Sequence, residues 1–142
     1  MNKLRKILSV LIATVLIIGC IPLEGLNAVF VFADNTSVNG AALIIENKYG
    51  APGTEVEVEV NVKNNPGVAG ATLSVQYVPQ LTLVSAEAGE AWNNLTFTAP
   101  AKLGNPSIFL WDSERGMTTD NGAILKLKFM ISSQANVGDQ LA

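Results

Sequence analysis

Two acidic residues in the last third of the sequence, Asp112 and Glu114, have the spacing of a candidate catalytic pair. A glycosidase needs two carboxyl groups that face each other across a cleft, about 5 to 10 Å apart. These two stand at the end of a predicted strand, where solvated acids or partner contacts are the simpler interpretation. The sequence has no histidine, and its one cysteine, Cys20, lies in an apolar N-terminal run. Nucleophilic Ser/His or Cys/His pairs are therefore excluded, and we expect no catalytic residue, no bound cofactor and no metal site.

The aromatic residues bear on sugar binding, because carbohydrate sites usually stack sugar rings on exposed Trp or Tyr faces. The sequence has only two of each. Strand alternation directs Trp111 and Tyr77 inward, whereas Trp92 and Tyr49 fall in predicted loops and form no common platform. Direct carbohydrate binding stays open as an alternative to protein binding.

The N-terminus has the pattern of a secretory signal peptide. A basic stretch at residues 3–6 precedes the apolar run Ile7 to Cys20, which is shorter than the roughly 20 residues that span a bilayer. Signal peptidase prefers small residues at the last and third-last positions before the cleavage site. Ala33 is small and Val31 is acceptable at these positions, which favours cleavage after Ala33. We therefore expect residues 1–33 to be a signal peptide of a secreted or cell-surface protein.

Two alternatives to simple cleavage remain. The sequence Ile17-Ile18-Gly19-Cys20 resembles the lipobox of bacterial lipoproteins, whose cysteine becomes a lipidated N-terminus at the membrane surface. The segment could also stay uncleaved as a membrane anchor.

Without residues 1–33, which hold three of the nine basic and one of the twelve acidic residues, the chain keeps six basic and eleven acidic residues. This acidic balance argues against nucleic acid as a partner.

Beyond a short linker at 34–40, side chains alternate with the period of two that is typical of β-strands. The clearest segment, Thr54 to Lys63, directs valines inward and glutamates outward. In Val68 to Tyr77 we expect Leu73 and Val75 inward. The segment Ala123 to Ile131 has Leu125 and Phe129 on its predicted inner face, and Ile124, Lys126, Lys128 and Met130 on its outer face. Weaker strands are predicted at 41–46, 81–87, 95–98 and 107–111.

These seven short strands are separated by turns rich in glycine, proline and asparagine. Strands at such regular spacing predict an all-β fold, a two-sheet β-sandwich with jelly-roll topology. We assign residues 41–142 to this single domain.

The turns and strand ends of this domain follow a particular order. They are Gly50-Ala-Pro-Gly53, Asn65-Pro-Gly-Val-Ala-Gly70, Tyr77-Val-Pro79, Leu81-Thr-Leu-Val-Ser85, Ile108-Phe-Leu-Trp-Asp112, Thr118-Thr-Asp-Asn-Gly122 and Leu127-Lys-Phe129. The series resembles the cohesins, the receptor modules with which cellulosome scaffolds hold dockerin-bearing enzymes, over residues 41 to 139. It departs from the common family pattern at Val78, Gly70 and Thr72, where many cohesins have Asp or Asn.

The resemblance implies a non-catalytic module that binds dockerins of polysaccharide-degrading enzymes, with calcium carried by the dockerin rather than by this chain. It also implies two further strands after the Gly138 region, so we expect the sandwich to lack its last strands. The partner-binding face would be the outer side of the sheet that contains the third, fifth and sixth predicted strands. Its candidate residues are Gly70, Thr72, Ser74, Gln76, Thr96, Thr98, Ile108, Leu110, Asp112 and Glu114.

Overall fold

The computed structural model describes residues 31–32 and 40–141. The predicted signal peptide, the lipobox-like sequence and the linker lie outside these residues, apart from Val31, Phe32 and Gly40. Eight strands are described: β1 Val31–Phe32, β2 Ala42–Ile45, β3 Glu55–Lys63, β4 Gly70–Val75, β5 Leu81–Ala88, β6 Thr96–Thr98, β7 Ser107–Asp112 and β8 Gly122–Ile131.

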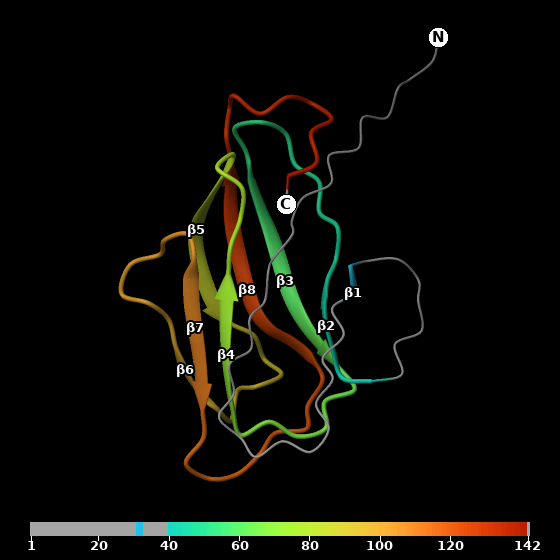
Figure 1. Cartoon of the computed structure of the whole chain (residues 1–142), viewed down its shortest axis with the longest axis vertical. Coiled ribbons are helices and arrows are strands. Elements are labelled where there is room, and N and C mark those ends of the chain that lie inside the picture. The colour runs from blue at the N-terminus through green and yellow to red at the C-terminus, as the bar shows by residue number, and fades with distance from the viewer. Residues whose placement is uncertain (1–30, 33–39, 142) are drawn as a thin grey trace.

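The described strands form two sheets that pack face to face (Figure 1). The larger sheet has the order β1-β2-β3-β8-β5, and the smaller has the order β4-β7-β6. Every pairing is antiparallel except that of β1 with β2, which is parallel. The predicted all-β, two-sheet sandwich is confirmed. The short strand β1 was not predicted, and cleavage after Ala33 stays a prediction.

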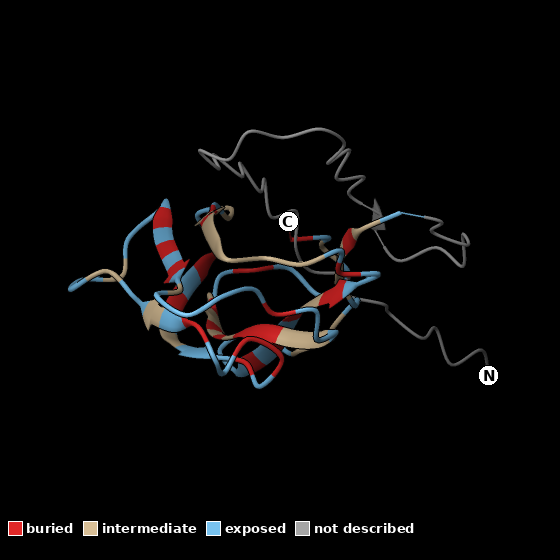
Figure 2. Ribbon diagram, turned by 90° about the horizontal axis from the view of Figure 1, so that it is seen from below, coloured by how far each residue is buried: buried red, intermediate tan, exposed pale blue. Residues whose placement is uncertain are grey.

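The alternation predicted for β3 is confirmed, since its valines are buried and its glutamates exposed. Across the ladder to β8, Glu57 lies opposite Lys128, and the lysine Nζ is 3.3 Å from Glu57 Oε1 and 3.8 Å from Glu55 Oε2. Figure 2 shows buried and exposed residues alternating along the strands. One face of this sheet is therefore core, and the other is a charged surface.

The prediction for Ile124 was wrong, because this side chain is only 1% exposed. The register between β3 and β8 shifts at this point: Val60 pairs with Leu125, but the next residue, Asn61, pairs with Ala123. The extra residue on β8 is a β-bulge, which interrupts strict alternation and re-aims a side chain. Ile124 and Leu125 consequently both enter the core.

Several predicted strands are shorter or longer than their patterns. The segment 68–77 forms a regular strand only from Gly70 to Val75, and the turn before it has Gly67 at a positive φ of 118°. Val68 makes an isolated bridge to Thr118 instead, with backbone hydrogen bonds of 2.9 Å in both directions. Strand β7 ends at Asp112, one residue beyond the end of the predicted strand.

The core lies between the sheets and contains every inward residue that the strand patterns predicted most clearly. These are Val56, Val58, Val60, Leu73, Val75, Phe109, Trp111, Leu125, Leu127 and Phe129. Tyr77 is half-buried and packs edge-on against Phe129, with ring centroids 5.1 Å apart. Buried Trp92 also belongs to the core, which the sequence pattern did not predict.

Candidate protein-binding face

The outer side of the β4-β7-β6 sheet brings together most of the candidate partner-binding residues. The register places Leu110 of β7 between Thr72 of β4 and Thr98 of β6. One row along, Asp112 lies between Gly70 and Thr96, and Ser74 lies opposite Ile108. Residues directly opposite each other in a sheet share a face, so these eight form one continuous surface. We call it the β4-β7-β6 face.

The centre of the β4-β7-β6 face is apolar and exposed. Ile108 is 47% exposed and Leu110 is 43% exposed, although they alternate with the deeply buried Ser107, Phe109 and Trp111 of the same strand. Small hydroxyl-bearing side chains flank them on β4 and β6, and none of the strand residues of this face except Asp112 is charged. Exposed apolar residues within a polar rim are typical of protein-binding surfaces.

Asp112 supplies the only charge of the face, at one end of the apolar row. Its carboxylate Oδ1 accepts a hydrogen bond of 2.9 Å from the backbone N–H of Ser113, and the side chain is exposed. A Cβ atom at Gly70 would lie 3.6 Å from this same Oδ1, so the glycine leaves space beside the carboxylate. The arrangement offers an accessible acceptor for a basic or hydroxyl side chain of a partner.

Two candidate residues lie outside the regular face. Gln76 follows the end of β4 and is exposed, and Glu114 lies in the loop after β7, also exposed. The loop at 113–116 has its own local hydrogen bonds, such as that from Arg115 N–H to Ser113 Oγ at 3.1 Å. Glu114 therefore belongs to a neighbouring loop rather than to a paired-carboxylate site with Asp112.

Aromatic packing behind the face holds it in place. Phe97 of β6 stacks on Phe109 of β7, with ring centroids 6.1 Å apart and planes 10° apart, and it contacts Trp111 at 5.2 Å. Trp111 in turn packs edge-on against Trp92, at 5.4 Å and 86°. Aromatic pairs in these arrangements add to the free energy gained from burial. A sheet of only three strands is thus backed by a continuous aromatic layer.

The opposite outer surface, on the larger sheet, has a different character. A shallow hollow on it is lined by glutamates and lysines of β3, β5 and β8: Glu57, Glu59, Glu87, Lys126 and Lys128, together with Val58, Ser85 and Leu127. Such mixed charge is the ordinary composition of a solvated sheet. The contrast between the two outer surfaces distinguishes the β4-β7-β6 face as the candidate binding surface.

Trp92 lies in the turn before β6, as predicted, but its side chain is only 5% exposed and packs against Trp111 in the core. Tyr49 is exposed, but Trp111 and Tyr77 are in or against the core. The four Trp and Tyr side chains therefore provide no stacking platform for a sugar ring.

In the described part of the chain, no group of three or more His, Cys, Asp or Glu residues could hold a metal ion. Residues 31–32 and 40–141 also include no helix of the length and apolarity that crossing a membrane requires.

The model of the cohesin domain matches residues 41–141, which is most of the sequence and the whole sandwich except β1. This chain belongs to the cohesin family. Its jelly-roll β-sandwich, as predicted from the strand spacing, is the fold of the solved cohesins. No curated relative matches the sequence.

Three solved cohesins show how far the likeness extends. The seventh ScaB type I cohesin from Pseudobacteroides cellulosolvens is 19% identical, with a TM-score of 0.59 and 68% of each chain covered. The sixth cohesin of scaffoldin B from Acetivibrio cellulolyticus, solved with a mutant Cel5 dockerin, is 24% identical, with a TM-score of 0.56 over 71% of this chain and 77% of that chain. A non-cellulosomal cohesin from Archaeoglobus fulgidus is 20% identical, with a TM-score of 0.54 over 68% of this chain and 69% of that one. At these identities the likeness shows the fold.

Proposed function

We propose that this cohesin domain binds a dockerin through the β4-β7-β6 face and performs no catalysis itself. The observation that carries the proposal is the exposed apolar pair Ile108 and Leu110, on a sheet surface whose one charged strand residue is Asp112. Family membership supports the class of partner, because a cohesin of the same fold was solved in complex with a dockerin.

The face supplies an apolar anchor and a polar end. Leu110 is flanked by two threonines, which allow close approach of a partner helix and offer hydroxyl hydrogen bonds. Asp112 lies one row further and can accept hydrogen bonds from a basic or hydroxyl side chain. A few anchors of this kind dominate binding free energy, while surrounding contacts mainly exclude water.

The domain would serve as a positioning module of a secreted or cell-surface scaffold that contributes to polysaccharide breakdown through the enzymes it holds. Calcium belongs to the dockerin in this scheme. Membership of a cellulosome scaffold needs its own test, since the family includes a non-cellulosomal member from an archaeon.

The test is titration of the protein against a panel of dockerins, with calcium present, by isothermal calorimetry. Leu110→Asp places a charge at the centre of the face and should weaken dockerin binding by about 2 kcal/mol or more, roughly thirtyfold. Val84→Asp is the matched control: Val84 is 45% exposed on β5 of the other sheet, so the same change should leave binding unchanged. Thermal melts of both variants check that they are folded.

The alternative function is direct carbohydrate binding, and soluble cellulose and xylan belong in the same titrations. Glycan binding that survives Leu110→Asp, with no dockerin bound by the unmodified protein, would reject the proposal. Trp92→Ala is unsuitable as a test of glycan binding, because removal of this buried ring would disturb the core.

A further inference from the structure

The β4-β7-β6 face is too small to be the whole contact surface of a protein partner. Its strands lie about 4.8 Å apart, and the steps from Gly70 to Ser74 cover about 13 Å, so the regular face measures roughly 10 by 13 Å. A specific interface buries about 800 Å² of each partner, which is several times this area. The contacts of a dockerin therefore extend to loops at the ends of the face.

The loop 113–117 follows β7 and adjoins the face at its Asp112 end (Figure 1). Gly70 pairs with Asp112 in the ladder of β4 and β7. Two residues before Gly70, Val68 makes the isolated bridge to Thr118. The loop is thus an excursion from the ladder, held by backbone pairs at both of its ends, and its residues 114–117 are exposed.

The apolar side chain of this loop is Met117. It is 67% exposed, more than Ile108 and Leu110 in the face itself. Its thioether lies over Gly67, because a Cβ atom added to that glycine would be 3.5 Å from Sδ and 3.6 Å from Cε. Gly67 is three residues before Gly70, a separation of at most about 11 Å. Met117 therefore adds an exposed apolar group directly beside the face.

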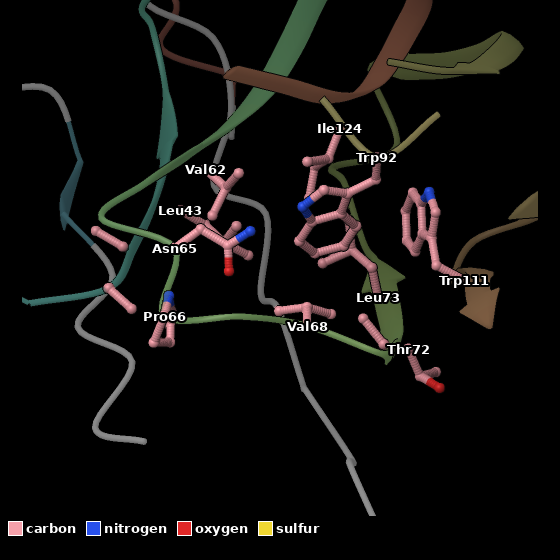
Figure 3. Close-up of a pocket in the computed structure, with 13 residues that line it drawn as sticks. Leu43, Val62, Asn65, Pro66, Val68, Thr72, Leu73, Trp92, Trp111 and Ile124 are labelled. Carbon is pink, nitrogen blue, oxygen red and sulfur yellow. The ribbon is translucent and has the colours of Figure 1, made fainter. Parts of the chain in front are cut away.

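Hydrogen bonds on both sides fix the backbone at Met117. Asn65 Nδ2 donates to Thr118 O, and Asn65 Oδ1 accepts from the N–H group of Gly67. Val68 and Thr118 exchange backbone hydrogen bonds of 2.9 Å. Figure 3 shows the course of this turn from Asn65 to Val68, beside an apolar cavity. A contact residue on a fixed backbone loses less conformational freedom when a partner binds.

We infer that Met117 is a third apolar contact for the dockerin, beside Ile108 and Leu110, and that a hydroperoxide weakens binding by oxidising its sulfur. This inference rests on the proposed function. Methionine is enriched in protein interfaces, and an exposed thioether is the form that peroxides oxidise to the sulfoxide. The sulfoxide is polar, so its burial against the partner costs desolvation free energy that the thioether does not require.

The oxidation needs only the thioether of Met117 and the peroxide. A sulfur lone pair attacks one peroxide oxygen, so that an S–O bond forms and the O–O bond breaks. The second oxygen takes up the peroxide proton and leaves as an alcohol, or as water when the oxidant is hydrogen peroxide. Sulfur loses two electrons and the peroxide gains two.

Met130 provides an internal reference for this chemistry. It is half-buried on β8, opposite Glu55 of β3 and Thr82 of β5, on the outer surface of the larger sheet. A partner on the β4-β7-β6 face does not cover that surface. Protection of Met117 alone would therefore report the contact itself.

The first experiment treats the full chain with hydrogen peroxide, with and without a dockerin that it binds, and follows both methionines by mass spectrometry of peptides. At a free dockerin concentration of about ten times its Kd, oxidation of Met117 should slow about tenfold, since only the free protein reacts. The rate at Met130 should stay unchanged. An unprotected Met117 in the complex would overturn the inference.

The second experiment measures dockerin binding by calorimetry before and after peroxide treatment. Oxidation and Met117→Gln should each weaken binding about threefold to tenfold, and methionine sulfoxide reductase should restore the oxidised protein. Met117→Leu keeps an apolar side chain, so it should bind like the unmodified protein and resist peroxide. This variant retains Met1, Cys20 and Met130, and its weakening by peroxide would place the effect at another residue.

The proposed function and the role of Met117 fail in different ways. Weaker binding by Leu110→Asp, with binding unchanged by oxidation and by Met117→Gln, would keep the proposed function and reject the role of Met117. No dockerin binding by the unmodified protein would reject both. Thermal melts accompany each titration, and a melting temperature that falls in parallel with binding would assign the effect of oxidation to the fold and overturn the inference.

Discussion

At the scale of single residues, the positions most sensitive to substitution are those where an added side-chain atom would clash with the neighbouring strand. Gly89 follows β5, and its backbone N–H donates to Ile124 O at 2.8 Å. A Cβ atom at Gly89 would lie 2.1 Å from the carbonyl oxygen of Ala123, which is far inside van der Waals contact. Gly89→Ala should therefore lower the free energy of unfolding by about 1–3 kcal/mol through overpacking.

The control for Gly89 is Gly104→Ala. There the nearest atom to an added Cβ is Pro106 O at 3.6 Å, an ordinary contact, and φ is not in the left-handed region. Urea unfolding of both variants provides the measurement. Equal stability of the two would show that β5 and β8 are further apart than the structure describes.

A second prediction at this scale concerns the two faces of β3. Val58 is fully buried, and a carboxylate there would have no partner, so Val58→Asp should unfold the domain. Glu57→Ala removes only the exposed ion pair with Lys128, and should change the free energy of unfolding by less than about 1 kcal/mol. Circular dichroism melts compare them. Equal tolerance of the two changes would mean that β3 has the opposite register.

At the scale of elements, the loops at one end of the sandwich depend on Asn65. Its Nδ2 group donates to Thr118 O at 3.1 Å and to Asp120 O at 3.0 Å, and its Oδ1 accepts from Gly67 N–H at 3.0 Å. These bonds join the β3–β4 turn to the β7–β8 loop. Asn65→Ala removes all three bonds and should destabilise the domain by about 1–3 kcal/mol.

Asn94→Ala is the control for Asn65, because Asn94 is exposed in the turn before β6. Hydrogen exchange should show faster opening of residues 64–68 and 117–121 in Asn65→Ala only. Unchanged exchange in these two loops would contradict the role assigned to Asn65.

At the scale of the whole molecule, the remaining prediction concerns the N-terminal segment and the location of the protein. The basic and apolar pattern of residues 3–33 leads us to expect export and a mature N-terminus at Asp34. N-terminal sequencing of the secreted protein measures this. A start at Cys20 with added lipid mass would instead make the protein a membrane-tethered scaffold, and an intact Met1 would contradict export.

The sequence by itself determined the strands and their faces, because the alternation of side chains along a strand is a local property. The valines of β3, the outward Ile108 and Leu110 and the inward Phe109 and Trp111 all follow from it. The grouping of β4, β6 and β7 in one sheet was also predictable, but through the resemblance to cohesins rather than through spacing.

Only the tertiary structure decided the features that depend on residues far apart in the chain. The bulge that buries Ile124 arises from the register between β3 and β8, and Trp92 is buried because it packs on Trp111 across the core. The crowding at Gly89 and the hydrogen bonds from Asn65 to Thr118 and Asp120 likewise involve partners more than 30 positions away. The place of β4 beside β7 follows from the order of strands in the sheet, which periodicity does not encode.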